Sequence, residues 1–146
     1  MRIDERGFTL IEMVLSVGIV TLLAGLSLPV YLSFQSGNDL TTTTETVADT
    51  LRRAETYVRA NSGDSQWGVD FRPGGVTLFQ GATYASRNTA FDEPVTIPGD
   101  VTVNYSGDII FSKLTGLPAS AAAIGFGSSN GSTSTVTINT AGAVDY

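Results

Sequence analysis

An apolar run over residues 8–34 is the feature that most constrains how this chain can fold. About 20 predominantly apolar residues suffice for a helix to cross the hydrocarbon core of a bilayer. Glu12 lies inside this run, near its start, although a charged side chain at the centre of a membrane helix costs about 2.5–3.5 kcal/mol. Because such residues usually pair with another group, Glu12 is a candidate functional residue.

Two simple interpretations of the N-terminal segment do not explain the whole pattern. A secretory signal peptide has an apolar core of about 7–15 residues, followed by a cleavage site between small residues. Here the run is longer, no such site follows it, and the two arginines of its leading segment are offset by Asp4 and Glu5. A plain single-span anchor fits the length of the run, but it accounts neither for Glu12 nor for the Gly7-Phe8 junction.

The junction RGFTLIE, residues 6–12, resembles the processing site of the type IV pilin and type II secretion pseudopilin superfamily. The resemblance implies that a prepilin peptidase removes the leader, residues 1–7, by cutting after Gly7. The same enzyme would then methylate the new N-terminal amine of Phe8. Glu12 stands where that family has a glutamate that would pair with the N-terminal amine of a neighbouring subunit, and Pro29 stands where these proteins often bend their helix.

The resemblance also implies an α+β fold, in which a long N-terminal helix packs on an antiparallel β-sheet head. Residues 8–34 would be the transmembrane part and residues 35–146 the head, with an amphipathic helix over 39–61 and a β-rich region over 66–146. Expected partners are prepilin peptidase, other pilin or pseudopilin subunits, membrane lipid, and an assembly platform protein with its ATPase. The expected location is the inner membrane, with a single span and the head outside the cytoplasm, and afterwards an extracellular or periplasmic filament.

The periodicity of the remaining chain supports this organisation. Apolar residues recur with helical spacing after residue 39, at Leu40, Val47, Leu51, Ala54 and Val58. The segment SGND at residues 36–39 contains poor helix formers and a candidate N-cap, so a break is expected there, and Asn61-Ser62-Gly63 is a stop signal. Alternating patterns then predict six or seven strands, at 67–72, 76–79, 95–97, 101–105, 109–112, 123–126 and 133–140.

Side chains in the predicted loops and helices offer few sites for chemistry. The segments 82–93 and 127–132 are expected to be loops, which places Asp92 and Glu93 in a loop, but no acidic spacing typical of a calcium site occurs. Trp67 is expected to be a core residue. Gly18 and Gly25 are expected on one helix face, where small residues permit close packing of membrane helices.

Composition argues against several functional classes. The chain has no cysteine and no histidine, so the common nucleophilic triads and zinc sites are not expected, nor is any cofactor or enzymatic activity. Its net charge is -6, and no lysine or arginine follows Lys113. Because binding to nucleic acid phosphates needs positive charge, no nucleic acid partner is expected.

The order of elements is most similar to the H-type pseudopilins and FimT-like minor pilins. The segments that carry this likeness are WGVDF at residues 67–71, VTLFQG at 76–81 and STVTINTAGAV at 134–144. A major pilin for adhesion, motility or DNA uptake is the first alternative, although such pilins often have a C-terminal cysteine pair. A single-span surface binding protein with a β-rich head is the second. Proteolytic processing distinguishes this second alternative from the pilin interpretations.

Overall fold

The computed structural model describes residues 7–60, 64–73, 75–113 and 115–146, and the side chain of Leu28 is not described. Its contacts divide the chain into two compact units. The N-terminal unit ends at Gln35, and the second unit, Ser36–Tyr146, is called the head unit below. The two units differ in packing, because all buried apolar side chains of the described residues lie in the head unit.

A single α-helix, α1 (Leu10–Arg59), continues through the position of the expected break at residues 36–39. Two of the threonines that follow bond through their hydroxyl groups to carbonyls of this helix: Thr41 Oγ1 donates to the Gly37 carbonyl oxygen at 3.1 Å and Thr44 Oγ1 to that of Leu40 at 2.8 Å. Leu40 is buried at the same turn, so tertiary packing outweighs the weak local propensity. The expected stop at residues 61–63 lies outside the described residues.

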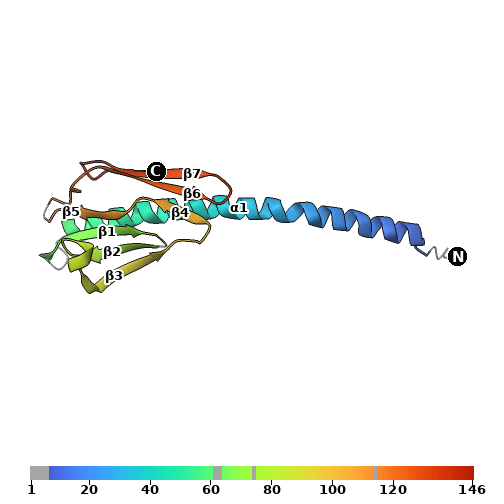
Figure 1. Cartoon of the computed structure of the whole chain (residues 1–146), viewed down its shortest axis with the longest axis horizontal. Coiled ribbons are helices and arrows are strands. Elements are labelled where there is room, and N and C mark those ends of the chain that lie inside the picture. The colour runs from blue at the N-terminus through green and yellow to red at the C-terminus, as the bar shows by residue number, and fades with distance from the viewer. Residues whose placement is uncertain (1–6, 61–63, 74, 114) are drawn as a thin grey trace, which may run out of the picture. The chain divides into compact units, whose positions relative to one another are not determined.

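The head unit contains two antiparallel four-stranded sheets instead of the single sheet that was predicted (Figure 1). The first has the order β3-β2-β1-β5 and the second the order β4-β6-β7-β8. Their strands are β1 (Trp67–Arg72), β2 (Gly75–Gln80), β3 (Asn88–Thr96), β4 (Val101–Asn104), β5 (Gly107–Phe111), β6 (Ala122–Ser128), β7 (Thr133–Ile138) and β8 (Val144–Asp145). A short 3-10 helix, η2 (Tyr84–Ser86), connects β2 to β3.

The α+β class is confirmed, and two details of the strand prediction are wrong. The segment expected as a loop at residues 82–93 contains the first part of β3. This strand pairs with β2, although it includes Pro94. Proline is tolerated there because β3 is an edge strand, where one row of N–H groups has no partner strand. The two-residue strand β8 was not predicted, because its pairing with Thr137 and Ile138 is too short to leave a sequence pattern.

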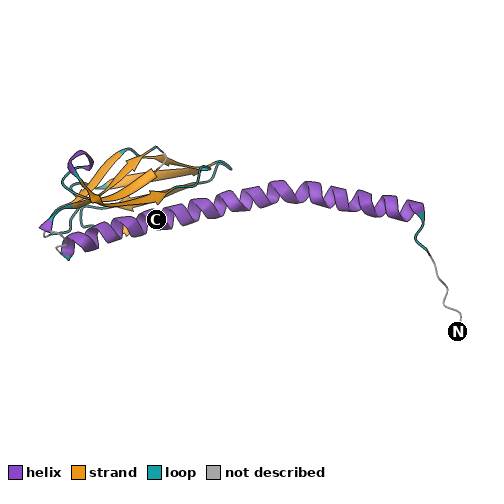
Figure 2. Ribbon diagram, turned by 90° about the horizontal axis from the view of Figure 1, so that it is seen from below, coloured by secondary structure: helices purple, strands orange, loops and turns teal. Residues whose placement is uncertain are grey.

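One hydrophobic core joins the C-terminal part of α1 to the inner faces of both sheets (Figure 2). The predicted helical stripe is confirmed, since all five of its residues are buried. Phe71 and Leu78 contribute to this core from the first sheet, and Ile124 and Val136 contribute from the second. Trp67 is also buried in it, as predicted, and its ring centroid lies 4.6 Å from that of Tyr57 on α1.

Gly68 marks a second, smaller packed region on the outer face of the first sheet. A Cβ atom at Gly68 would lie 2.6 Å from Ile110 Cδ1, 2.9 Å from Phe79 Cζ and 3.0 Å from the Ile109 carbonyl oxygen. We expect Gly68→Ala to lower the free energy of unfolding by about 1–3 kcal/mol, as overpacking does. Thermal unfolding measured by circular dichroism would test this.

The matched control is Gly75→Ala at the start of β2, where the nearest atom to the added Cβ is the Val95 carbonyl oxygen at 4.0 Å. This variant should be as stable as the parent or slightly more stable, because alanine has less backbone entropy to lose on folding. Equal melting temperatures for the two variants would contradict the close packing described for Gly68.

Candidate functional site: the start of the N-terminal helix

Thr9 caps the N-terminal end of α1. Its Oγ1 accepts a hydrogen bond from the Glu12 N–H at 3.3 Å, and its carbonyl oxygen accepts one from the Met13 N–H at 3.2 Å. A threonine three residues before a glutamate is the spacing of a capping box. Sequence reasoning missed Thr9, although this spacing directly before an apolar run is a known signature of a helix start.

The cap fixes where Glu12 lies relative to the Gly7-Phe8 junction. Glu12 is in the first turn of α1, where the positive end of the helix dipole favours a negative side chain. Gly7, Phe8, Thr9 and Glu12 line a common open depression of about 360 Å³. The structure therefore places Gly7, Phe8 and Glu12, three of the residues singled out in the sequence, next to one another.

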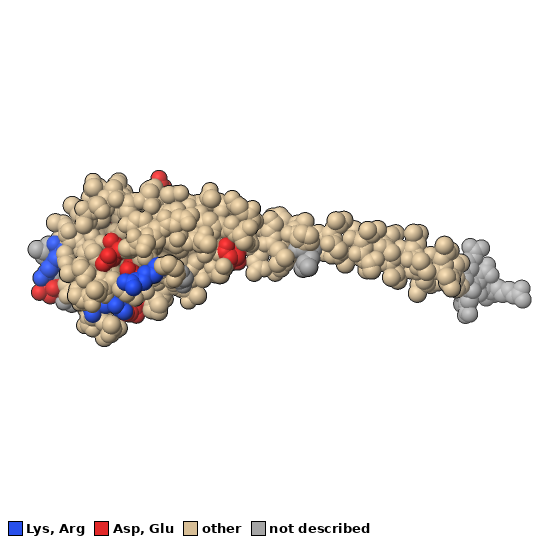
Figure 3. Space-filling view, viewed as in Figure 1, with Lys and Arg blue, Asp and Glu red and all other residues tan. Residues whose placement is uncertain are grey.

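The large apolar side chains of the N-terminal unit are exposed wherever the structure describes them. Those of Phe8, Leu10 and Ile11 are 78%, 82% and 74% exposed. Of the described helices, α1 is the one whose length and composition would allow it to cross a membrane, with a mean hydropathy of 2.2 over its most apolar window. Figure 3 shows this part of the helix almost without charged atoms, in contrast to the head unit.

Three hydroxyl groups within the apolar segment donate hydrogen bonds to carbonyl oxygens of the helix itself. Ser16 Oγ donates to the Glu12 carbonyl oxygen at 2.7 Å, and Ser27 Oγ donates to that of Ala24 at 2.9 Å. Thr21 Oγ1 makes similar bonds to the preceding turn. An unpaired polar group costs several kcal/mol in hydrocarbon, so these bonds make the segment compatible with lipid despite its polar residues.

Pro29 and the two helix glycines are located, but their expected roles stay predictions. Pro29 lies inside α1, and helix is assigned on both sides of it. A Cβ atom added at Gly18 or Gly25 would meet nothing within 4 Å. Both glycines therefore leave open space for a neighbouring helix, which is what close packing of membrane helices would need.

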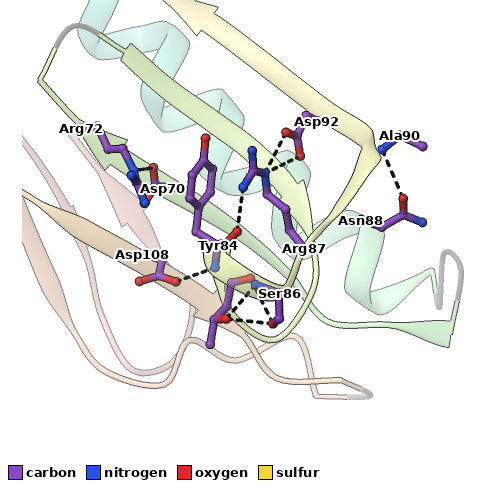
Figure 4. A network of polar contacts seen from close by, with 10 residues as sticks. Asp70, Arg72, Tyr84, Ser86, Arg87, Asn88, Ala90, Asp92 and Asp108 are labelled. Atoms are coloured by element: carbon purple, nitrogen blue, oxygen red, sulfur yellow. Dashed lines mark hydrogen bonds and ion pairs between the residues drawn. The ribbon is translucent and has the colours of Figure 1, made fainter.

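The head unit holds a polar network that sequence reasoning did not find (Figure 4). The Arg87 guanidinium donates through Nε to both Asp92 oxygens, at 3.0 and 2.8 Å, and through Nη1 to the Tyr84 carbonyl oxygen at 2.8 Å. Its hydrogen bonds with Asp92 raise the pKa of Arg87 above its ordinary value. Asp92 lies in β3, so the prediction that places it in a loop is wrong.

A second ion pair completes this network from β1. Arg72 Nε lies 2.7 Å from Asp70 Oδ2, and the guanidinium carbons of Arg72 and Arg87 lie 4.2 and 3.7 Å from the centroid of the Tyr84 ring. Asp108 accepts a hydrogen bond from the Tyr84 N–H at 3.0 Å. These contacts attach the connection between β2 and β3 to the first sheet, which is a structural role.

Glu93, the other acidic residue expected in a loop, also lies in β3 and binds α1. Its carboxylate accepts hydrogen bonds from Arg53 and from the Tyr57 hydroxyl. The pKa of Arg53 is raised by its hydrogen bond with Tyr57, which has the largest effect, and by its hydrogen bond with Glu93. Within the described residues, no three acidic side chains gather in a way that could hold a metal ion. The best-defined candidate site is therefore the depression at the start of α1.

Comparison with known families also points to the start of α1. The family model of the prokaryotic N-terminal methylation motif matches residues 2–28, which include the four described residues that line the depression. Neither a curated protein nor a solved structure matches the chain. The comparison thus characterises the N-terminal segment, and the head unit is characterised by its structure.

Proposed function

Because an N-terminal methylation motif indicates a type IV pilin-like prepilin, we propose that this chain is a structural subunit of a type IV pilus or of a type II secretion pseudopilus. Within that class, a minor pilin or pseudopilin fits best. The observation that carries the proposal is the motif over residues 2–28, whose helical part exposes its large apolar side chains. The long helix on antiparallel sheets is consistent with the type IV pilin fold.

The geometry at the start of α1 supports a specific maturation step. Gly7 and Phe8 precede the first helical residue, Leu10, and a peptidase needs an extended, accessible segment of this kind. We expect prepilin peptidase to cut after Gly7 and to methylate the amine of Phe8. Cutting there leaves Thr9 in the chain, so the cap of α1 is retained in the mature protein.

Glu12 would then act during assembly. An isolated carboxylate within lipid is unfavourable, whereas an ion pair with the Phe8 amine of a neighbouring subunit compensates part of the desolvation cost of both groups. Since the amine and the carboxylate meet at one axial offset only, the pair would also set the register between neighbouring helices. A platform protein in the inner membrane, together with its ATPase, would move the processed subunit into the growing filament.

Mass spectrometry of the protein from its native host tests the maturation step. We expect a mature chain that starts with N-methyl-phenylalanine at position 8. Gly7→Leu should abolish cleavage, because a bulky residue beside the scissile bond no longer fits a site that accepts glycine. The leader would then remain attached.

The matched control is Gly25→Leu, which introduces the same residue within the span but away from the junction. This variant should be processed like the parent chain. An intact Met1 on the chain in native membranes and filaments would contradict the proposal and would favour a single-span surface binding protein.

A further inference from the structure

Phe91 is an exposed aromatic residue at an edge of the head unit. Its side chain is 47% exposed, and it belongs to β3, which lies at one edge of the first sheet. Its ring meets that of Trp67 edge-on, with 6.1 Å between centroids, and Trp67 is buried. Because Trp67 supports one side of the ring, Phe91 would lose little conformational freedom if another molecule covered its other side.

The second sheet carries an open hollow of about 780 Å³ where β6 begins and β7 ends, called the hollow below. It is lined by residues 121–123, 137–139 and 143–145. Six of these nine residues are alanine, isoleucine or valine, and Asp145 is the only charged one. The small side chains leave room for an aromatic ring, and apolar walls favour the transfer of such a ring from water.

Contacts with α1 place the hollow and Phe91 at similar levels on different flanks of the helix. Arg52 Nη2 donates to the carbonyl oxygen of Val144, which lines the hollow, at 3.2 Å. On the other flank, the Tyr57 ring lies 4.6 Å from that of Trp67, which contacts Phe91. Arg52 and Tyr57 are five residues apart, which corresponds to about 7.5 Å along a helix and about 140° around its axis. Figure 1 shows β3 and β7 on opposite sides of the head unit, so the two surfaces can face different neighbours.

We propose that Phe91 of one copy of this chain enters the hollow of a second copy. The contact would be heterologous, because it joins two different surfaces, and heterologous contacts that do not close into a ring build an open helical filament. Since the two surfaces lie at similar levels of α1, neighbouring copies can stand side by side with their helices in the same direction. Copies that are anchored in one membrane through their N-terminal segments share that direction.

The charge of the two surfaces allows a second copy to be the occupant. Whole copies repel one another, because the net charge of the chain is -6. Residues 88–91 are uncharged, and Asp145 is the one charged residue among residues 115–146. Arg87 and Asp92, which flank the segment 88–91, form an ion pair at 2.8 Å. Two copies can therefore meet through these surfaces with little electrostatic repulsion.

Phe91 fits this role better than the other exposed large apolar residues of the described head unit, Leu117 and Tyr146. Tyr146 directly follows Asp145, so it lies beside the hollow itself, and Leu117 is less exposed, at 38%. Because Phe91 is already half-buried, the contact would be weak in solution. It rests on the proposed function for its strength, since anchoring in one membrane raises the effective concentration of the copies.

Cysteine cross-linking of the full chain in native membranes tests the proposal, because the chain has no cysteine of its own. Two differently tagged copies would be expressed together, one with Thr89→Cys near Phe91 and one with Thr137→Cys in the hollow. Both threonines are exposed. We expect a short bismaleimide to join the two kinds of copy several-fold more efficiently than it joins identical copies. Equal yields of mixed and self-joined products would overturn the proposal, and so would the absence of a mixed product.

Two further substitutions show whether Phe91 and the hollow make the contact. Phe91→Ala in the first copy should reduce the mixed product several-fold, whereas Leu117→Ala, which removes another exposed apolar side chain, should leave it unchanged. Ala143→Leu in the second copy should also reduce it, because a larger side chain fills part of the hollow, whereas Ala141→Leu, at an exposed position outside the lining, should not. An unchanged yield with both Phe91→Ala and Ala143→Leu would overturn the proposal.

Mass spectrometry of the N-terminus of each sample separates this inference from the proposed function. A processed chain that starts at Phe8 but gives no mixed product would overturn the inference alone. An intact Met1 would contradict the proposed function.

Discussion

Replacing Glu12 by alanine should leave the protein processed and inserted in the membrane but largely absent from filaments. The substitution removes a costly charge from the span, so insertion should be unharmed or slightly improved. Cleavage should continue, because the Gly7-Phe8 bond is four residues away and the Thr9 cap bonds to the Glu12 backbone N–H, which alanine retains. Assembly should suffer, since the Phe8 amine of a neighbouring subunit would lose its partner.

The expected size of the Glu12→Ala effect follows from the environment of the pair. Removing one partner of a buried ion pair costs about 3–5 kcal/mol, because the remaining charge is left uncompensated. By that scale, incorporation should fall by at least two orders of magnitude, as about 1.4 kcal/mol corresponds to a factor of ten. Immunoblots of the membrane and sheared-filament fractions would measure both populations in one experiment.

Two controls make the Glu12→Ala result interpretable. Glu45→Ala changes an exposed glutamate of the head unit and should not alter the distribution of the protein. The corresponding substitution in the most abundant pilin of the same filament should also be tested, because a subunit at the tip lacks one neighbour and would tolerate the change. Normal incorporation of both Glu12→Ala and the abundant-pilin variant would show that the proposed pairing does not occur.

Replacing Phe71 by alanine should destabilise the head unit more than any surface change. Phe71 is fully buried between α1 and the first sheet, and its ring meets that of Tyr105 edge-on at 5.3 Å between centroids. Phenylalanine-to-alanine substitutions in cores cost about 3–5 kcal/mol, from lost burial and the cavity that remains. Denaturant titration monitored by the fluorescence of Trp67, the single tryptophan of the chain, would measure this loss.

Phe91→Ala provides the matched comparison for Phe71→Ala. Phe91 is 47% exposed on the edge strand β3, and its ring touches Trp67 at its edge with 6.1 Å between centroids. Its removal should cost much less, because little apolar area returns to water and no enclosed cavity forms. Comparable losses for the two variants would contradict the description of the core.

The parts of the molecule that could be predicted are those whose signal is local. The helical stripe from Leu40 to Val58 follows from a spacing of three and four residues, and β1 and β2 follow from alternation across a short turn. The prediction failed where distant segments decide the outcome. The predicted break before Leu40 did not occur because the core holds that turn in the helix, and residues 88–93 form a strand because β2 lies beside them.

The candidate site at the N-terminus follows from local sequence, because every group in it lies within six consecutive residues: the Gly7-Phe8 junction, the Thr9 cap and Glu12. Local spacing alone places these groups together once a helix starts at Leu10. The contacts of the head unit depend instead on tertiary packing, such as those of Arg53 with Glu93 and of the Tyr84 N–H with Asp108. Strand pairing and helix packing join residues that are far apart in the chain, and no local pattern specifies which of them meet.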